Sequence, residues 1–288
     1  MKLRLPILGI LTCLAGTSCF AADLRLPGKA VAGQPLTIQT SGSGDATLYV
    51  AGPGTAIKRD IKLGEPVEVK ADELRNSGYF TVALKASDGN SSKELYVAPA
   101  AAEKINFLAR PSRVRIGEPK VIAGTAFVFD QYDNLVVQPT PVTFDLSVPS
   151  AGSKVDRLTS KDGVAYLQTG SSSKAGTGQF VVTVGNTSVR RVVEETASEP
   201  CNLRLKVHKE KDSLIAETDP VRDCSGNPLP DGTVVTFTSS EPGKGRSTVD
   251  APIRKGIARA VLPAVPGETV SVASGVVLGN EVRWGGGL

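Results

Sequence analysis

The sequence is poor in the side chains from which enzyme active sites are usually built. Its 288 residues include one histidine, His208, and only 5% aromatic residues. A single histidine cannot supply a multi-histidine zinc site, and its place among lysines in an alternating segment is typical of an exposed strand residue. A glycosidase-like pair of carboxylates leaves no sequence motif, but it would need a deep acidic cleft between domains. The composition therefore predicts a protein that is not an enzyme and needs no cofactor.

Basic blocks, phosphate-binding loops and long apolar runs are also missing. The formal net charge falls from +4 to +2 when Lys2 and Arg4 are removed with the N-terminal segment, and the remaining basic residues are mixed with acidic ones. This pattern argues against a nucleic-acid groove. No glycine-rich loop joins a strand to a helix, and no apolar run after residue 22 is long enough to span a bilayer.

Residues 1–21 are predicted to be a secretory signal peptide. Lys2 and Arg4 precede an apolar run over residues 5–15, and small residues lead to a cleavage site after Ala21. The mature protein is therefore expected outside the cytoplasm, in the periplasm, at the cell surface or secreted. An alternative makes Cys19 a site of lipid attachment, although the large aliphatic residue expected three positions before such a cysteine is missing.

Two of the four cysteines lie in the signal segment, which leaves Cys201 and Cys224 in the exported chain. An even pair in an oxidising compartment suggests a disulfide. The alternative is a pair of buried free thiols.

Short segments of alternating apolar and polar residues predict β-strands along the whole exported chain. Phe80, Val82 and Leu84, for example, alternate with less apolar residues, as in a strand with one buried face. Clusters of Gly, Asp, Asn and Ser separate these segments as turns, and only residues 71–75 look helical, over a single turn. Because the connections are short, we expect antiparallel pairing.

The pattern predicts an all-β protein made of three β-sandwich domains in tandem. The predicted domains cover residues 23–98, 104–193 and 201–284, with linkers at residues 99–102 and 194–200 and a disordered tail at residues 285–288.

An internal repeat relates the second domain to the third. Asp130 recurs as Asp223 after 93 residues, and the same step joins Asn134 to Asn227, Phe144 to Phe237, Gly163 to Gly256 and Ala165 to Ala258. A period of this length exceeds that of solenoid repeats and is close to one small β-sandwich.

The repeated positions resemble the core signature of bacterial Ig-like domains of the invasin and intimin type. The third domain carries the elements of this signature as Asp223, Gly226-Asn-Pro228, Gly232, Val235-Thr-Phe237 and Gly256-Ile-Ala258. The second keeps Asp130, Asn134, Val142-Thr-Phe144 and Gly163-Val-Ala165, but Asp133 replaces the glycine and Leu135 the proline. The first domain lacks the signature. The resemblance implies three immunoglobulin-like sandwiches used as a rigid spacer or adhesive unit on a bacterial surface.

This architecture gives the shared residues a structural interpretation. Asn227 suits a left-handed turn, and Phe237 fills a core, so these positions are expected to build the fold rather than bind a ligand. Cys201 would open one strand and Cys224 would follow the next, so antiparallel pairing would bring them within bridging distance. A loop of about 23 residues closed by that bridge would add roughly 3 kcal/mol to stability.

Two functions from different classes follow. The first is a non-catalytic structural or interaction protein that binds a protein partner in the bacterial envelope through an edge strand or a loop. The second is a polysaccharide-binding module, for which Trp284 is the candidate contact, although its place in the last strand favours packing on the sandwich. The clustered oxygens of residues 130–134 could also hold calcium, and the simpler interpretation is an Asx-type turn.

Overall fold

The computed structural model describes residues 22–241 and 243–285, and this part of the chain is built of β-strands. It contains one 3₁₀ turn, η1 (Ala71–Glu73), where the sequence predicts a single helical turn. The chain divides between Ala100 and Ala101 into two compact units. The predicted signal peptide with Cys19, and residues 286–288 of the predicted tail, lie outside the described residues. Within the described ranges, no helix has the length and apolar character needed to cross a membrane.

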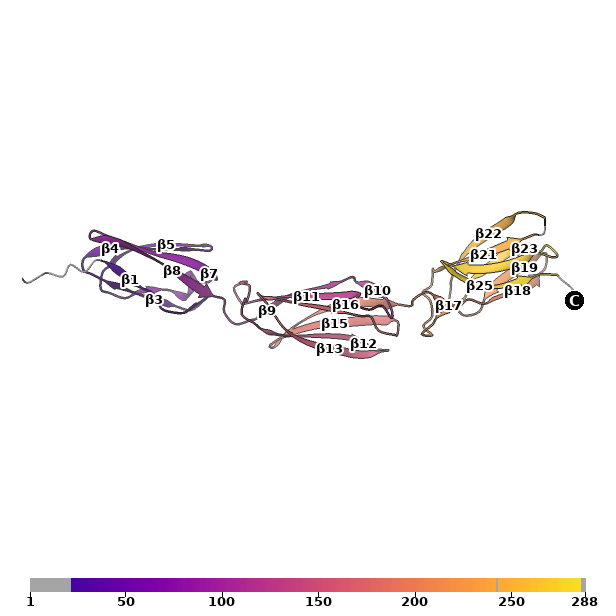
Figure 1. Ribbon diagram of the computed structural model, residues 1–288, viewed down its shortest axis with the longest axis horizontal. Helices are drawn as coiled ribbons and strands as arrows, with labels where there is room; N and C mark the ends of the chain where they lie inside the picture. Colours follow the sequence, from indigo (N-terminus) through magenta and orange to yellow (C-terminus); the bar gives the residue numbers. More distant parts are fainter. Residues whose placement is uncertain (1–21, 242, 286–288) are drawn as a thin grey trace, which may run out of the picture. The chain divides into compact units, whose positions relative to one another are not determined.

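The first unit is a sandwich of a five-stranded sheet, ordered β2-β8-β7-β4-β5, and a three-stranded sheet, ordered β1-β3-β6 (Figure 1). Alternating residues bury one face of each sheet, with Leu48, Phe80 and Ile38 fully inside. The strands are β1 (Asp23–Arg25), β2 (Ala30–Val31), β3 (Leu36–Ser41), β4 (Asp45–Gly52), β5 (Thr55–Lys62), β6 (Val67–Val69), β7 (Gly78–Ala86) and β8 (Gly89–Ala98).

The second unit begins with another sandwich, in which a five-stranded sheet, ordered β10-β16-β15-β12-β13, faces a three-stranded sheet, ordered β14-β11-β9. Its strands are β9 (Lys104–Arg110), β10 (Arg113–Arg115), β11 (Ile122–Phe129), β12 (Pro141–Val148), β13 (Gly152–Thr159), β14 (Val164–Thr169), β15 (Gly176–Val184) and β16 (Thr187–Thr196).

Three phenylalanines fill the core of this second sandwich. The ring centroids of Phe107 and Phe180 are 5.2 Å apart, and Phe144 lies 6.0 Å from each of them. Gly124 of β11 lies so close that a Cβ there would stand 2.8 Å from the Phe180 ring. Glycine at this position therefore makes room for the aromatic cluster.

The third sandwich completes the second unit. A four-stranded sheet, ordered β22-β21-β24-β25, is accompanied by a three-stranded sheet, β18-β19-β23, and a two-stranded sheet, β17-β20. Its strands are β17 (Pro200–Asn202), β18 (Leu205–Glu210), β19 (Ser213–Thr218), β20 (Arg222–Asp223), β21 (Val234–Ser240), β22 (Arg246–Pro252), β23 (Arg259–Pro263), β24 (Thr269–Ser274) and β25 (Val277–Arg283). The predicted class, an all-β chain of sandwich domains, is confirmed.

The expectation of purely antiparallel pairing is wrong in two places. β2 pairs in parallel with β8, and β10 pairs in parallel with β16. Parallel strands need a long connection, and here the rest of the sandwich provides it, since the paired strands lie near opposite ends of the domain sequence. The short turns between consecutive strands do not reveal such pairings.

The predicted linker at residues 194–200 is also structured. Its first three residues continue β16 and pair with β10, and Pro200 opens β17. Glu195 and Ala197 are buried, because they continue the inward-facing alternation that starts at Val193. This segment is part of the fold.

Candidate functional site

The Asp130 turn of the second sandwich is held together by its own aspartate. The buried carboxylate of Asp130 accepts hydrogen bonds from the backbone N–H groups of Tyr132 and Asn134, both at 2.9 Å, and from the side-chain amide of Asn134 at 2.9 Å. Asp133 adopts a positive φ of 67° at the position where the third sandwich has Gly226, with φ 81°. Asp and Asn tolerate this conformation better than most residues, so the replacement of glycine is accommodated.

The Asp223 turn repeats this arrangement 93 residues later. The carboxylate of Asp223 accepts from the backbone N–H groups of Ser225 and Asn227 at 2.9 Å and from the Asn227 amide at 3.1 Å. It also accepts from the N–H of Ser198 at 3.2 Å. Burial raises the pKa of Asp223, but the hydrogen bonds from Asn227, Ser198 and Ser225 outweigh it and lower the pKa below its ordinary value.

Backbone hydrogen bonds connect each turn to the glycine that the repeat also preserves. The N–H of Val128 donates to the carbonyl oxygen of Gly163 at 2.9 Å, and the N–H of Val221 donates to that of Gly256 at 2.8 Å. Both glycines have positive φ, 80° and 86°. The side chains of the paired Phe144 and Phe237 are fully buried. These contacts support a fold-making role for the signature.

The contacts of residues 130–134 fit the Asx-type turn. Lys104 places its ammonium 2.7 Å from Asp133 Oδ1 and 3.0 Å from the carbonyl oxygen of Gln131, while Asp130 receives the N–H groups of the turn. A cationic side chain of the protein thus already occupies the outer oxygens. In the described ranges, no cluster of three or more acidic, histidine or cysteine side chains is arranged to hold a metal.

The disulfide between Cys201 and Cys224 is present, with a sulfur–sulfur distance of 2.06 Å and a Cα–Cα distance of 4.7 Å. Antiparallel pairing of β17 with β20 brings the two cysteines together. Both cysteines are exposed, so the alternative of buried free thiols is wrong.

Asn227 has a second function that its partner in the repeat does not suggest. Its amide nitrogen donates to the carbonyl oxygen of Ser173 at 3.2 Å, and its Oδ1 accepts from the N–H of Ala175 at 3.1 Å. Lys174, between them, donates to the carbonyl oxygen of Ser225 at 3.0 Å. The loop between β14 and β15 of the second sandwich is therefore hydrogen-bonded to the signature turn of the third.

His208 lies on a strand as predicted, whereas Trp284 lies just after β25 and not within the last strand. His208 is exposed on β18. Trp284 is partly buried against the core of the third sandwich, so it does not present an open platform to a sugar.

Three tyrosines form a surface on the first sandwich that is not among the predicted sites. Tyr79 and Tyr96 are cross-strand partners on β7 and β8, with ring centroids 5.1 Å apart, and are 71% and 40% exposed. Tyr49 of β4, 38% exposed, pairs with Ala83 of β7, about 13 Å along the strand from Tyr79. We call this surface the tyrosine face.

Alternation could have revealed the tyrosine face. Tyr49 lies between the core residues Leu48 and Val50, and Tyr96 lies between Leu95 and Val97. A residue between two inward-facing positions of a strand must point outward. Beside Tyr49, the face has a hollow of about 600 Å³ lined also by Asp60 and Lys85.

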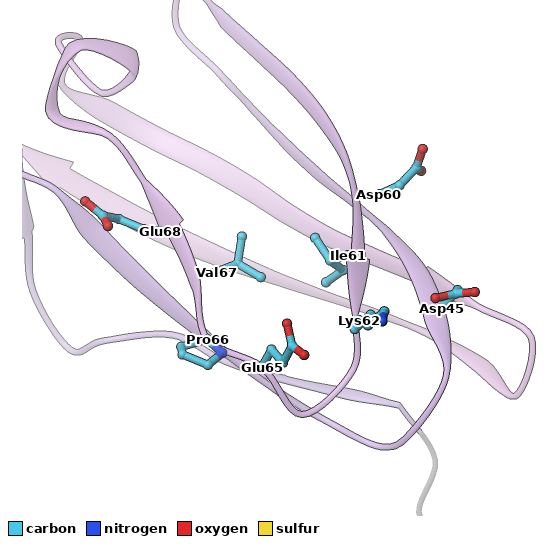
Figure 2. A pocket seen from close by; sticks show the side chains of 8 residues that line it. All are labelled: Asp45, Asp60, Ile61, Lys62, Glu65, Pro66, Val67 and Glu68. Atoms are coloured by element: carbon cyan, nitrogen blue, oxygen red, sulfur yellow. The ribbon is translucent and has the colours of Figure 1, made fainter.

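A second groove, of about 550 Å³, opens between the edge strands β5 and β6 of the first sandwich (Figure 2). Ile61 and Val67 face each other across it, and the side chain of Asp60 projects outward from β5 at the rim. The carboxylates along its rim are exposed: Asp45, Asp60, Glu65 and Glu68. The groove is an open flank of the sandwich, and it lacks the buried carboxylate environment that an acid–base pair needs.

The fold is that of tandem immunoglobulin-like β-sandwich domains. Among solved structures, the chain is similar to FdeC, an Escherichia coli adhesin, with a TM-score of 0.63 and 16% identity over 92% of this chain and 96% of that one. It is also similar to invasin, a bacterial integrin-binding protein, with a TM-score of 0.51 and 12% identity over 92% of this chain and 60% of invasin. InvD of Yersinia pseudotuberculosis gives a TM-score of 0.51 and 10% identity over 91% and 95%. No protein-family model and no curated protein matches the sequence.

Proposed function

We propose that this chain is an exported, non-catalytic interaction protein of the bacterial envelope that binds a protein partner through the tyrosine face. The observation that carries the proposal is the exposure of Tyr49, Tyr79 and Tyr96 on one sheet face. Tyrosine supplies a large apolar contact area with a polar tip, and it is enriched at protein interfaces. The fold shared with an adhesin and an integrin-binding protein supports the same function.

In this proposal, the second and third sandwiches serve as a spacer. Hydrogen bonds between Asn227 and the β14–β15 loop restrict motion between them. In small-angle scattering of the full chain, Asn227→Ala should broaden the distribution of dimensions. Ser225→Ala is the control, because only the backbone of Ser225 contributes to the junction. Equal profiles for the two variants would contradict the spacer function.

The binding function is tested by capture from an envelope fraction. The unaltered chain should retain a protein that the triple variant Tyr49→Ser, Tyr79→Ser and Tyr96→Ser loses. Tyr166→Ser is the matched control, because Tyr166 is also exposed, at 56%, but lies on the second sandwich. Capture of the same proteins by the triple variant and the unaltered chain would refute the proposed surface.

The tyrosine face also provides the observation that favours the alternative, a polysaccharide-binding module. Aromatic side chains on one sandwich face are what such a module requires, and this face, rather than Trp284, supplies them. Binding to a glycan array that the triple tyrosine variant abolishes, without capture of a protein, would establish this alternative. Trp284→Ala should leave glycan binding unchanged, because Trp284 packs on the third core.

A further inference from the structure

Glu195 is a carboxylate at an inward-facing position of β16 and is only 1% exposed. Its Oε2 accepts a hydrogen bond from the N–H of Ser172 at 2.6 Å. Its Oε1 is also buried and has no hydrogen-bond partner within the described part of the chain. A buried carboxylate oxygen without a partner is destabilising, because it has lost its hydrogen bonds to water and no protein hydrogen bond replaces them. Such a group favours a ligand that can donate to it.

Glu195 lies in the wall of a pocket of about 280 Å³ formed by the second sandwich alone. Strands β12 and β13 form one side, and the loop after β14 forms the other. The lining combines apolar groups from Leu146, Val148 and Ala151 with serine hydroxyls. This volume is below the roughly 300–1,000 Å³ typical of sites for drug-sized ligands, so the pocket suits a single functional group with a short stem.

Lys154 is the one basic residue in this lining. Its ammonium donates to Oγ1 of the buried Thr169 at 2.7 Å and forms no ion pair with Glu195 among the described residues. Oε1 of Glu195 is therefore available to an external donor.

We propose that the Glu195 pocket binds an ammonium or guanidinium group carried on an aliphatic stem. The cation would donate to Oε1, and the stem would contact the apolar wall. A charge-assisted bond of this kind is the strong form of the hydrogen bond. A divalent cation is a poorer match, because calcium requires six to eight oxygens and the pocket supplies one carboxylate. The cation comes either from a free small amine or from a lysine or arginine side chain of another protein. The site does not depend on the tyrosine face.

The test is a titration of the full chain with three probes: n-butylammonium, n-propylguanidinium and Nα-acetyl-lysine methylamide, a peptide mimic with a free side-chain ammonium. Binding is measured by calorimetry and by the NMR shifts of residues 170–173. We expect saturable binding that Glu195→Gln weakens at least tenfold, the equivalent of about 1.4 kcal/mol. The amide variant keeps an acceptor for Ser172, and its fold is checked by its unfolding midpoint. Equal affinity for the free amine and the peptide indicates recognition of the cation alone, whereas tighter peptide binding indicates a partner side chain.

Lys154→Met is the second variant, because it removes the one resident cation. Binding should persist in it. Binding that appears only in Lys154→Met and is absent from the unaltered chain would overturn the proposal, since Lys154 would then be the partner of Glu195. No binding of any cationic probe at millimolar concentration, undiminished binding in Glu195→Gln, or Glu195-dependent binding of calcium chloride alone would also overturn it.

Discussion

Replacing Asp223 by alanine should destabilise the third sandwich more than most single substitutions. The carboxylate is 4% exposed and accepts from three backbone N–H groups, those of Ser198, Ser225 and Asn227. Each hydrogen bond to a charged group contributes about 1.5–3 kcal/mol. In the alanine variant, water can bind some of the N–H groups that lose their acceptor, which offsets part of the loss. The expected decrease in the free energy of unfolding is therefore about 3–5 kcal/mol. For a domain of this size, 3 kcal/mol lowers the melting temperature by roughly 12–24 °C.

The assay uses the fluorescence of Trp284, the single tryptophan in the sequence. Because Trp284 packs against the third core, its signal reports the unfolding of that sandwich. Asp130→Ala removes the equivalent carboxylate from the second sandwich and is the matched control, which should leave the Trp284 transition in place. A loss below about 1 kcal/mol in Asp223→Ala, or an equal shift in Asp130→Ala, would refute the fold-making interpretation of the turn.

Lowering the pH should remove the stabilisation that the Asp223 carboxylate provides. The pKa of Asp223 is lower in the folded state than its ordinary value of 3.8. Its ionised form therefore stabilises the fold fully above pH 3.8, and this stabilisation is lost as the pH falls from there through the depressed pKa. The stability difference between the unaltered chain and Asp223→Ala should shrink over this window. A difference that is constant with pH would show that the charge of the carboxylate is not what stabilises the turn.

Reduction of the bridge between Cys201 and Cys224 should lower the stability of the third sandwich by about 3 kcal/mol, and an unchanged Trp284 transition after thiol treatment would contradict this. Both Gly163→Ala and Gly256→Ala force a side chain into a positive φ, at a cost of about 1–2 kcal/mol. Gly163→Ala should cost a further 1–3 kcal/mol or so, because its Cβ meets a leucine side chain, whereas nothing lies within 4 Å at Gly256. Hydrogen exchange measures the stability of the second sandwich in Gly163→Ala and of the third in Gly256→Ala. Equal losses of stability in the two variants would argue against the steric explanation.

Local chemistry explains what the sequence could predict. The signature turn is recognisable because Asp223 accepts from the backbone of residues two and four positions further along the chain, so a short motif encodes the turn itself. The additional bond from Ser198, 25 residues earlier, has no such motif. Alternation, which is also a local pattern, predicted the buried strand faces. It also predicts Tyr49 and Tyr96 on an outer face, although that conclusion requires the strands of one sheet to be considered together.

Contacts between segments that are far apart in the chain are harder to predict from the sequence. β10 and β16 are about 80 residues apart in the chain, and no local pattern specifies their parallel pairing. Glu195 has the parity of an inward-facing residue, but its charge and the nearby proline favoured a linker. Its buried carboxylate accepts a hydrogen bond from Ser172, and Asn227 is hydrogen-bonded to Ser173 and Ala175, and no motif marks any of these three partners.

The parallel pairing of β10 with β16 has a mechanical consequence. Thr187, at the start of β16, donates to the carbonyl oxygen of Glu103, and β10 pairs near the other end of β16, where the chain leaves the sandwich. The chain therefore enters beside one end of β16 and exits at the other. Tension applied through the two ends pulls along the strands, so the hydrogen bonds between them are loaded together in shear instead of being opened one at a time. In the first sandwich, β2 pairs in parallel with β8, so the hydrogen bonds between these two strands are arranged in the same way.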